Sequence, residues 1–272
     1  MLGLLSEMFS YGFLTRAFLV GTLVSLAAAL LGVSLVLKRY SMIGDGLSHV
    51  GFGALSIAFA LNLAPLYVSI PACVVAAFFL LKISENSKIK GDAAIALIAS
   101  SSLAIGVIAT SLSSGLSVDV YGYMFGSILA MQQSDVYISV ALSVAVLAVY
   151  VLCYNKIFAI TFDADFARAT GTKAGFYNML LALLTALTIV VGMRIMGTML
   201  ISSLIIFPAL SAMRVLRSFK GVIICSGIIS IVCFFLGMVF SYVFSIPTGA
   251  SVVVVNLAVF LIFYVIGKLL KR

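Results

Sequence analysis

The sequence predicts an all-α membrane protein, a bundle of eight or nine helices that each cross a lipid bilayer. Of the 272 residues, 64% are apolar and only 9% are charged, whereas an ordinary soluble domain has roughly 25% charged residues. With a mean hydropathy of +1.31, the chain cannot cover a water-facing surface with polar groups. This composition excludes a soluble globular enzyme, a disordered chain and a nucleic-acid-binding module, despite the net charge of +8.

Apolar stretches that approach the length of a membrane span follow one another along the whole chain, which we treat as a single domain, residues 1–272. A spanning helix needs about 20 mostly apolar residues. The stretches are 13–37, 42–62, 66–82, 92–112, 134–153, 176–193, 197–213, 221–245 and 250–267. Only residues 194–196 separate the sixth and seventh, which therefore predict either two spans or one broken, re-entrant pair. The second alternative gives eight spans.

The basic residues predict the orientation of the bundle. If the N-terminus is outside and nine helices alternate, 14 of the 16 Lys and Arg residues fall on the cytoplasmic side, leaving Arg16 and Arg194 outside. Such an excess is typical of cytoplasmic loops. The C-terminus is then cytoplasmic and the connection 113–133 is external. Within that connection, residues 118–131 predict a short interfacial or re-entrant helix, and a plain belt of aromatic residues is the alternative.

One predicted span carries ionisable side chains well inside it. Asp45 and His49 are four residues apart, so on a helix they share one face. Ionisable residues inside a membrane are costly and need a reason. A carboxylate oxygen and an imidazole nitrogen suit zinc, manganese or iron. The pair predicts a metal site, although two ligands do not close such a site, and a structural Asp–His pair is the alternative.

The longest cytoplasmic connection, residues 154–175, predicts a short helix. Asp163 or Thr161 can cap a helix from Ala164 to Thr170, which Gly171 would end. So short a helix is marginal by itself and would gain stability by docking against another protein, whereas an ordinary capped turn is the alternative. The chain has no GxxxxGK[ST] phosphate loop, so ATP-driven transport would require a separate ATPase chain.

Five segments resemble the membrane subunits of zinc and manganese ABC importers (the ABC-3 type). Residues 43–49 (Ile-Gly-Asp-Gly-Leu-Ser-His) resemble the family's Gly-Asp-x-x-x-His segment. Residues 123–130 resemble its Tyr-Leu-Phe-Gly-Asp-Leu-Leu-Ala segment, 197–212 its Gly-x-Leu-Leu-x-Ser-Leu-Leu-x-x-Pro-Ala-x-x-Ala run, and 247–252 its Pro-x-Gly-x-x-Val ending. Residues 165–171 resemble a degenerate Glu-Ala-Ala-x-x-x-Gly coupling loop. The order is the family's, and the likeness is greatest to bacterial high-affinity zinc-uptake permeases.

The resemblance implies a transport subunit and not an enzyme: a homodimeric permease of the bacterial cytoplasmic membrane, with cytoplasmic ABC ATPase subunits and an extracytoplasmic metal-binding protein as partners. It implies that Asp45 and His49 line the path of a transported divalent ion, zinc first and manganese or iron as alternatives. No permanently bound cofactor and no nucleic acid are expected. The residues that it implies for contact with the ATPase, in the loop 154–175, are Asp165, Ala167, Arg168 and Gly171.

The sequence departs from the family's pattern at three points. Ser127 stands where the family often has Asp, and Asp165-Phe166 replaces Glu-Ala in the coupling loop. The histidine-rich tracts of some zinc proteins are missing, because His49 is the single histidine. These departures weaken the choice of zinc over manganese or iron.

Two other functions compete with the importer. A proton-coupled secondary carrier could use Asp45 and His49 as a proton relay, but such carriers usually contain inverted repeats, and the two halves of this sequence show none that is convincing. An intramembrane enzyme is disfavoured because the sequence has no HExxH motif, no GxSxG nucleophile elbow and no second histidine.

Overall fold

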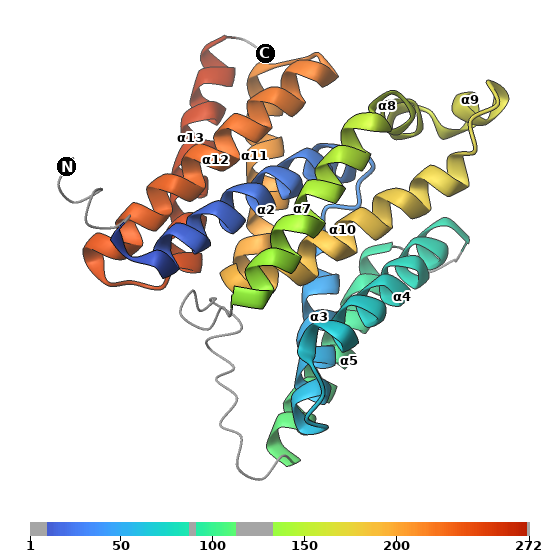
Figure 1. Ribbon diagram of the computed structural model, residues 1–272. Coiled ribbons are helices and arrows are strands. Elements are labelled where there is room, and N and C mark those ends of the chain that lie inside the picture. Colours follow the sequence, from blue (N-terminus) through green and yellow to red (C-terminus); the bar gives the residue numbers. More distant parts are fainter. Residues whose placement is uncertain (1–9, 87–90, 113–132, 271–272) are drawn as a thin grey trace.

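The computed structural model describes residues 10–86, 91–112 and 133–270, and these form helices and no strand (Figure 1). The external helix expected within 118–131, with the segment 123–130 and Ser127, lies outside the described residues. The described helices are α2 (Gly12–Leu37), α3 (Ile43–Ala60), α4 (Pro65–Asn86), α5 (Gly91–Leu112), α7 (Gln133–Leu152), α8 (Tyr154–Phe162), α9 (Ala164–Ala169), α10 (Ala174–Met196), α11 (Thr198–Val215), α12 (Phe219–Phe244) and α13 (Thr248–Leu269).

Within this described part of the chain, nine helices are long and apolar enough to cross a membrane. The shortest of these nine helices, α3 and α11, have 18 residues each. This length corresponds to about 27 Å, close to the thickness of the hydrocarbon core. The two closely spaced segments are separate helices, α10 and α11, which Gly197 joins with a φ of 85°. Only glycine adopts this backbone conformation without strain. The structure therefore favours nine spans over eight and confirms the all-α bundle.

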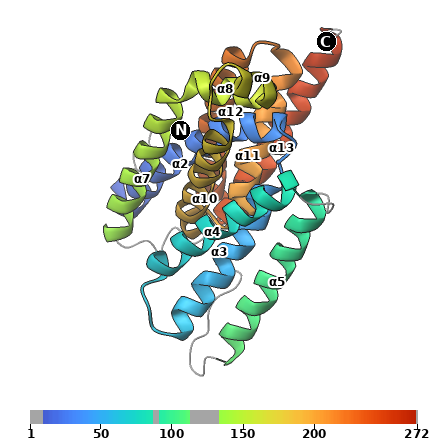
Figure 2. The same cartoon turned by 90° about the vertical axis from the view of Figure 1, so that its right-hand side faces the viewer.

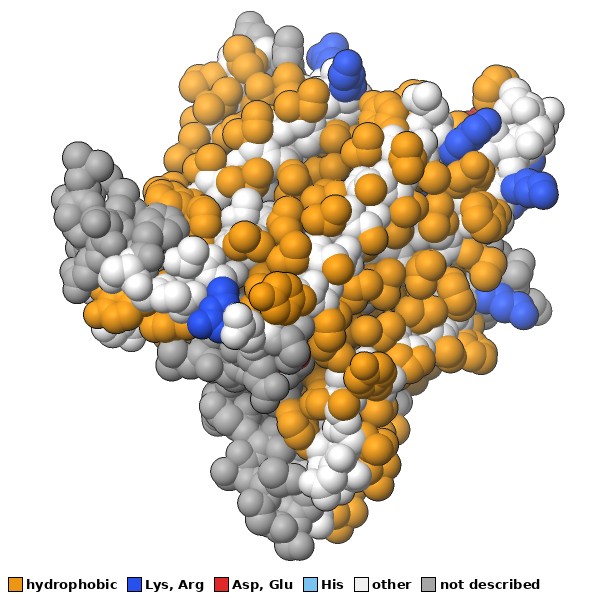
Figure 3. All heavy atoms as spheres, viewed as in Figure 1, with side chains coloured by type: hydrophobic (Ala, Val, Ile, Leu, Met, Phe, Trp, Pro, Cys, Tyr) orange, Lys and Arg blue, Asp and Glu red, His pale blue; other side chains and the backbone are white. Residues whose placement is uncertain are grey.

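The helices divide into a central group and an outer group. In α2, α3, α10, α11 and α12, 56–67% of the residues of each apolar window are buried, compared with 22–33% in α4, α5, α7 and α13. Figure 2 shows α5, α7 and α13 along the margins of the bundle. The outer helices expose many large apolar side chains (Figure 3), as expected of surfaces that face lipid.

Small residues let neighbouring helices approach one another closely. The hydroxyl of Ser230 in α12 donates to the carbonyl oxygen of Ser25 in α2 over 2.8 Å. A Cβ added at Gly32 of α2 would overlap the backbone carbonyl of Ile205 in α11. A Cβ added at Gly53 of α3 would lie 2.7 Å from the carbonyl oxygen of Ser102 in α5. Close backbone contact of this kind is how helices associate in lipid.

Basic side chains gather at one end of the bundle. On the face shown in Figure 3 they lie mainly along the edge that holds α8, α9 and the C-terminal end of α13. At this end, helices that are far apart in the sequence contact one another through aromatic and basic side chains. The Arg214 guanidinium of α11 lies 5.1 Å from the Tyr264 ring of α13, and the Phe219 ring of α12 lies 5.1 Å from the Phe158 ring of α8. The charge asymmetry predicted from the sequence is thus a property of the folded molecule.

We expect Gly32→Ala to destabilise the protein by about 1–3 kcal/mol, because α2 and α11 must separate to admit a methyl group. The measurement is the thermal unfolding temperature of the purified protein in detergent. Gly175→Ala is the matched control, because a Cβ at Gly175 meets nothing within 4 Å. Equal unfolding temperatures for the two variants would contradict the close α2–α11 contact.

Candidate functional site: the metal pair and the coupling hairpin

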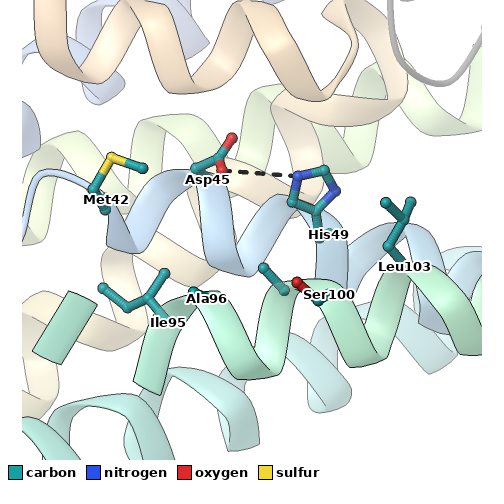
Figure 4. Close-up of a pocket in the computed structure, with 8 residues that line it drawn as sticks. Met42, Asp45, His49, Ile95, Ala96, Ser100 and Leu103 are labelled. Atoms are coloured by element: carbon teal, nitrogen blue, oxygen red, sulfur yellow. Dashed lines mark ion pairs between the residues drawn. The ribbon is translucent and has the colours of Figure 1, made fainter. Parts of the chain in front are cut away.

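The first turns of α3 hold the acidic and imidazole side chains on one face, as predicted. Asp45 lies in the first turn and His49 in the next, and His49 Nε2 is 3.8 Å from Asp45 Oδ2 (Figure 4). The helix begins at Ile43. His49 therefore lies about 9 Å along the helix. A carboxylate in the first turn of a helix is also favoured by the helix dipole.

A cavity of about 290 Å³ between α3 and α5 gives access to this pair. The side chain of Asp45 is 42% exposed and that of His49 is 22% exposed, so neither is sealed in the core. Sequence analysis did not identify the remaining lining residues, because α5 reads as an apolar span with no distinctive spacing. The cavity is lined by Met42, Asp45, His49, Ile95, Ala96, Ala99, Ser100 and Leu103.

Glycines hold the turn that carries Asp45 tightly between two neighbouring helices. A Cβ at Gly46 would lie 2.6 Å from the side chain of Ile95 in α5. A Cβ at Gly44 would lie 2.9 Å from the side chain of Ile205 in α11. Because these approaches fix the rotation of α3, they also fix which face the carboxylate presents.

The spacing of Asp45 and His49 permits both to bind one ion. Two ligands that each lie about 2.1 Å from a metal are at most about 4.2 Å apart, and the observed separation is 3.8 Å. Among the described residues, no group of three or more His, Cys, Asp and Glu side chains could hold a metal. In this part of the chain the pair therefore offers two candidate ligands, which lie beside an open cavity.

The connection 154–175 folds into two short helices, α8 and α9, which we call the coupling hairpin. Asp163 is the N-cap of α9, as predicted. Its Oδ1 accepts hydrogen bonds from the backbone N–H of Asp165 (3.0 Å) and of Phe166 (2.8 Å). Thr161, the other predicted cap, instead donates to the carbonyl oxygen of Ile157 within α8. We did not predict α8. Its one-sided apolar pattern, with Ile157 and Ile160 buried, was the available signal.

Of the four residues implied for the ATPase contact, Asp165, Arg168 and Gly171 are exposed and Ala167 is buried. Asp165 and Arg168 form an exposed ion pair of 3.1 Å, with side-chain exposures of 92% and 58%. Ala167 is fully buried and packs in a small cluster with Ile160 and Ala174, separate from the main core. Gly171 ends α9 with a φ of 81°. The hairpin thus presents charged side chains and the exposed Phe166 on its outer surface, and it packs on α10 through a small apolar cluster.

Comparison with known proteins decides the family. Residues 10–267 match the model of the ABC 3 transport family. The chain belongs to this family. It is 31% identical over 265 residues to the manganese import system permease protein ScaB of Streptococcus gordonii, covering 96% of this chain and 95% of that protein. It is 32% identical over 263 residues to a Haemophilus influenzae protein named as a probable iron transport system membrane protein, covering 96% and 93%.

A solved structure shows that the fold is shared as well. The chain superposes on one chain of PsaBC from Streptococcus pneumoniae in complex with Fab with a TM-score of 0.86 and 30% identity, covering 97% of this chain and 95% of that one. As a member of the ABC 3 family, the protein is an integral membrane permease subunit of the ABC type. The prediction of a transport component and not an enzyme is confirmed.

We expect Gly171→Ala to loosen the C-terminal end of α9, because a left-handed backbone is unfavourable by about 1–2 kcal/mol for residues other than glycine. The N–H of Thr172, which donates to the carbonyl oxygen of Ala167 over 2.9 Å, should exchange with solvent about tenfold faster. Hydrogen exchange read by mass spectrometry measures this change. Gly175→Ala is again the control, and unchanged protection in Gly171→Ala would contradict the role of the glycine.

Proposed function

We propose that this protein is the permease subunit of a bacterial ATP-driven importer of a divalent first-row metal ion, with manganese as the preferred ion. The observation that carries the proposal is the Asp45–His49 pair, 3.8 Å apart and open to a cavity between α3 and α5. Family membership limits the function to transport. Among the described residues that line this cavity, the pair then supplies the only carboxylate and imidazole.

The choice of ion rests on the donor atoms and on the relatives. Carboxylate and imidazole ligands suit manganese, iron and zinc, and Ser100 would add a hydroxyl oxygen, a ligand that favours manganese over softer ions. The two relatives are named for manganese and iron. The expectation of zinc, which came from the resemblance, has no support in these names. We therefore place manganese first, with iron and zinc as competitors.

A homodimer would complete the coordination of the ion. One protomer offers two strong ligands, and a two-fold axis beside the α3–α5 cavity would bring the same two ligands from the other copy. The 42% exposure of the Asp45 side chain supports this arrangement, because a carboxylate in an apolar bundle needs a polar or charged neighbour. Four ligands would replace part of the hydration shell while the ion crosses.

The coupling hairpin is the proposed contact with a cytoplasmic ATPase. Asp165, Phe166 and Arg168 are exposed on α9 and form a surface that a groove on a partner can bind.

We place the C-terminus in the cytoplasm and the protein in the bacterial cytoplasmic membrane. An extracytoplasmic metal-binding protein would deliver the ion at the opposite end of the bundle. Movement of the hairpin on ATP hydrolysis would open or close the cavity beside α3.

We expect Asp45→Asn and His49→Gln each to reduce manganese uptake by at least about tenfold, because each replacement keeps the shape of the side chain and removes a strong ligand. Uptake of radioactive manganese is measured in metal-starved cells that lack the native gene and express each variant at equal level in the membrane. Iron and zinc uptake, measured in parallel, ranks the ions.

Asp135→Asn is the control for removal of a carboxylate, because Asp135 also lies in the first turn of a span, in α7, away from the cavity. Its uptake should equal that of the wild type. Normal uptake of all three ions by both Asp45→Asn and His49→Gln would exclude this pair from the path.

We expect cysteines introduced at Asn62 and Lys173 to react from opposite sides of the membrane. Asn62 lies between α3 and α4, and Lys173 lies between the coupling hairpin and α10. In a background without the four native cysteines, a membrane-impermeant maleimide added to intact cells (spheroplasts, where an outer membrane is present) should label the Asn62 position. The Lys173 position should be labelled only after lysis. The reverse pattern would invert the proposed orientation.

A further inference from the structure

The joint between α2 and α3 is a rigid helix end. Arg39 adopts a left-handed conformation with a φ of 62°, which is uncommon for a residue other than glycine. Its N–H donates to the carbonyl oxygen of Val36 over 3.0 Å, and the N–H of Tyr40 donates to that of Leu35 over 2.8 Å. These are the two hydrogen bonds of a Schellman motif. The backbone at Lys38, the C-cap of α2, is therefore held in one conformation.

From this fixed position, the side chain of Lys38 reaches two other helices. Its Nζ donates to the carbonyl oxygen of Ile160 in α8 over 3.0 Å and to Oδ1 of Asn178 in α10 over 2.7 Å. Ile160 lies in the last turn of α8, where carbonyl groups lack partners within the helix and a cation is favoured. Ile160 and Asn178 are almost fully buried. Loss of the ammonium would therefore remove hydrogen bonds to buried acceptors, which is more costly than at a surface.

Lys38 thus stands between the two functional parts of the molecule. On one side, α8 continues from Ile160 through Asp163 directly into α9. On the other side, residues 38–42 lead into α3, where Asp45 lies in the first turn. The hairpin also packs on α10 through the small apolar cluster at Ala167. Its helix α8 contacts Phe219 of α12 through Phe158 and places Ile157 in the main core. Charge-assisted hydrogen bonds are directional and stronger than neutral ones. A displacement of α8 in either direction is therefore transmitted to Lys38.

We propose that Lys38 is a positioning residue that transmits movement of the coupling hairpin to the first turn of α3 and its metal pair. This inference rests on the proposed function. When an ATPase displaces α9, the end of α8 moves with it. Lys38 then draws the α2–α3 joint along and shifts Asp45 relative to α5, and the same path operates in reverse when metal binds.

The test is the number of manganese ions imported per ATP hydrolysed by the full chain with its ATPase and metal-binding protein in proteoliposomes. Lys38→Met keeps the length of the side chain and removes its hydrogen bonds. We expect the ratio to fall by about fivefold, in the range that single residues contribute to coupling between sites, while ATP hydrolysis without metal persists. Lys38→Arg, which can still donate to both acceptors, should restore much of the ratio. Lys82→Met, at an exposed lysine of α4, is the matched control and should leave the ratio unchanged.

Asn178→Leu gives a second, independent variant that removes one acceptor and leaves Lys38 in place. It should lower the ratio in the same direction, and the double variant should be no worse than Lys38→Met, because both remove one connection. If Lys38→Met fails to assemble, Asn178→Leu decides the question. A wild-type ratio in the assembled variant, or a proportional loss of import and ATP hydrolysis, would overturn the coupling role alone. A wild-type complex that hydrolyses ATP and imports no manganese, iron or zinc would overturn the proposed function and this inference together.

Discussion

The free-energy cost of placing a carboxylate and an imidazole in an apolar helix bundle is the constraint on which the rest of the structure depends. Asp45 and His49 are tolerated because α3 presents them to a cavity that lies between α3 and α5. Their position in turn requires a slim helix, and glycines at the contacts with α5 and α11 provide it. The helices therefore pack closely at the glycines beside the pair, and the cavity leaves the two side chains accessible. An open site is what the passage of an ion needs.

The two functional parts are built by different physical means. The metal pair depends on close helix contacts within the large core, which deform little. The coupling hairpin depends on one capping carboxylate, one glycine and a small separate cluster, and its helix α8 also packs on the main core through Ile157. The Lys38 side chain extends from a rigid helix end and connects the hairpin to the start of α3 through its hydrogen bonds to α8 and α10.

Several residues of the candidate site and of the coupling hairpin could be predicted from residue chemistry. Asp45 and His49 were found because ionisable residues are conspicuous in an apolar span, and the Asp163 cap was found because its chemistry is local. In contrast, Ser100 and Met42 are ordinary residues whose place in the cavity depends on how α5 packs against α3. Lys38 was one basic residue among many near helix ends. Its partners in α8 and α10 are more than 120 residues away in sequence, and no local pattern encodes such a contact.

The sequence by itself determined that the protein is a membrane-embedded helical bundle, how its charges divide between the two ends, and that Asp45 and His49 share one helix face. Hydrophobicity, charge and helical spacing are local properties, so they can be read along the chain. Only the tertiary structure decided that α10 and α11 are separate spans, that α8 exists as a helix, and that Lys38 joins the hairpin to the start of α3. These features depend on how helices distant in sequence pack, because packing sets backbone turns and side-chain partners that no single segment specifies.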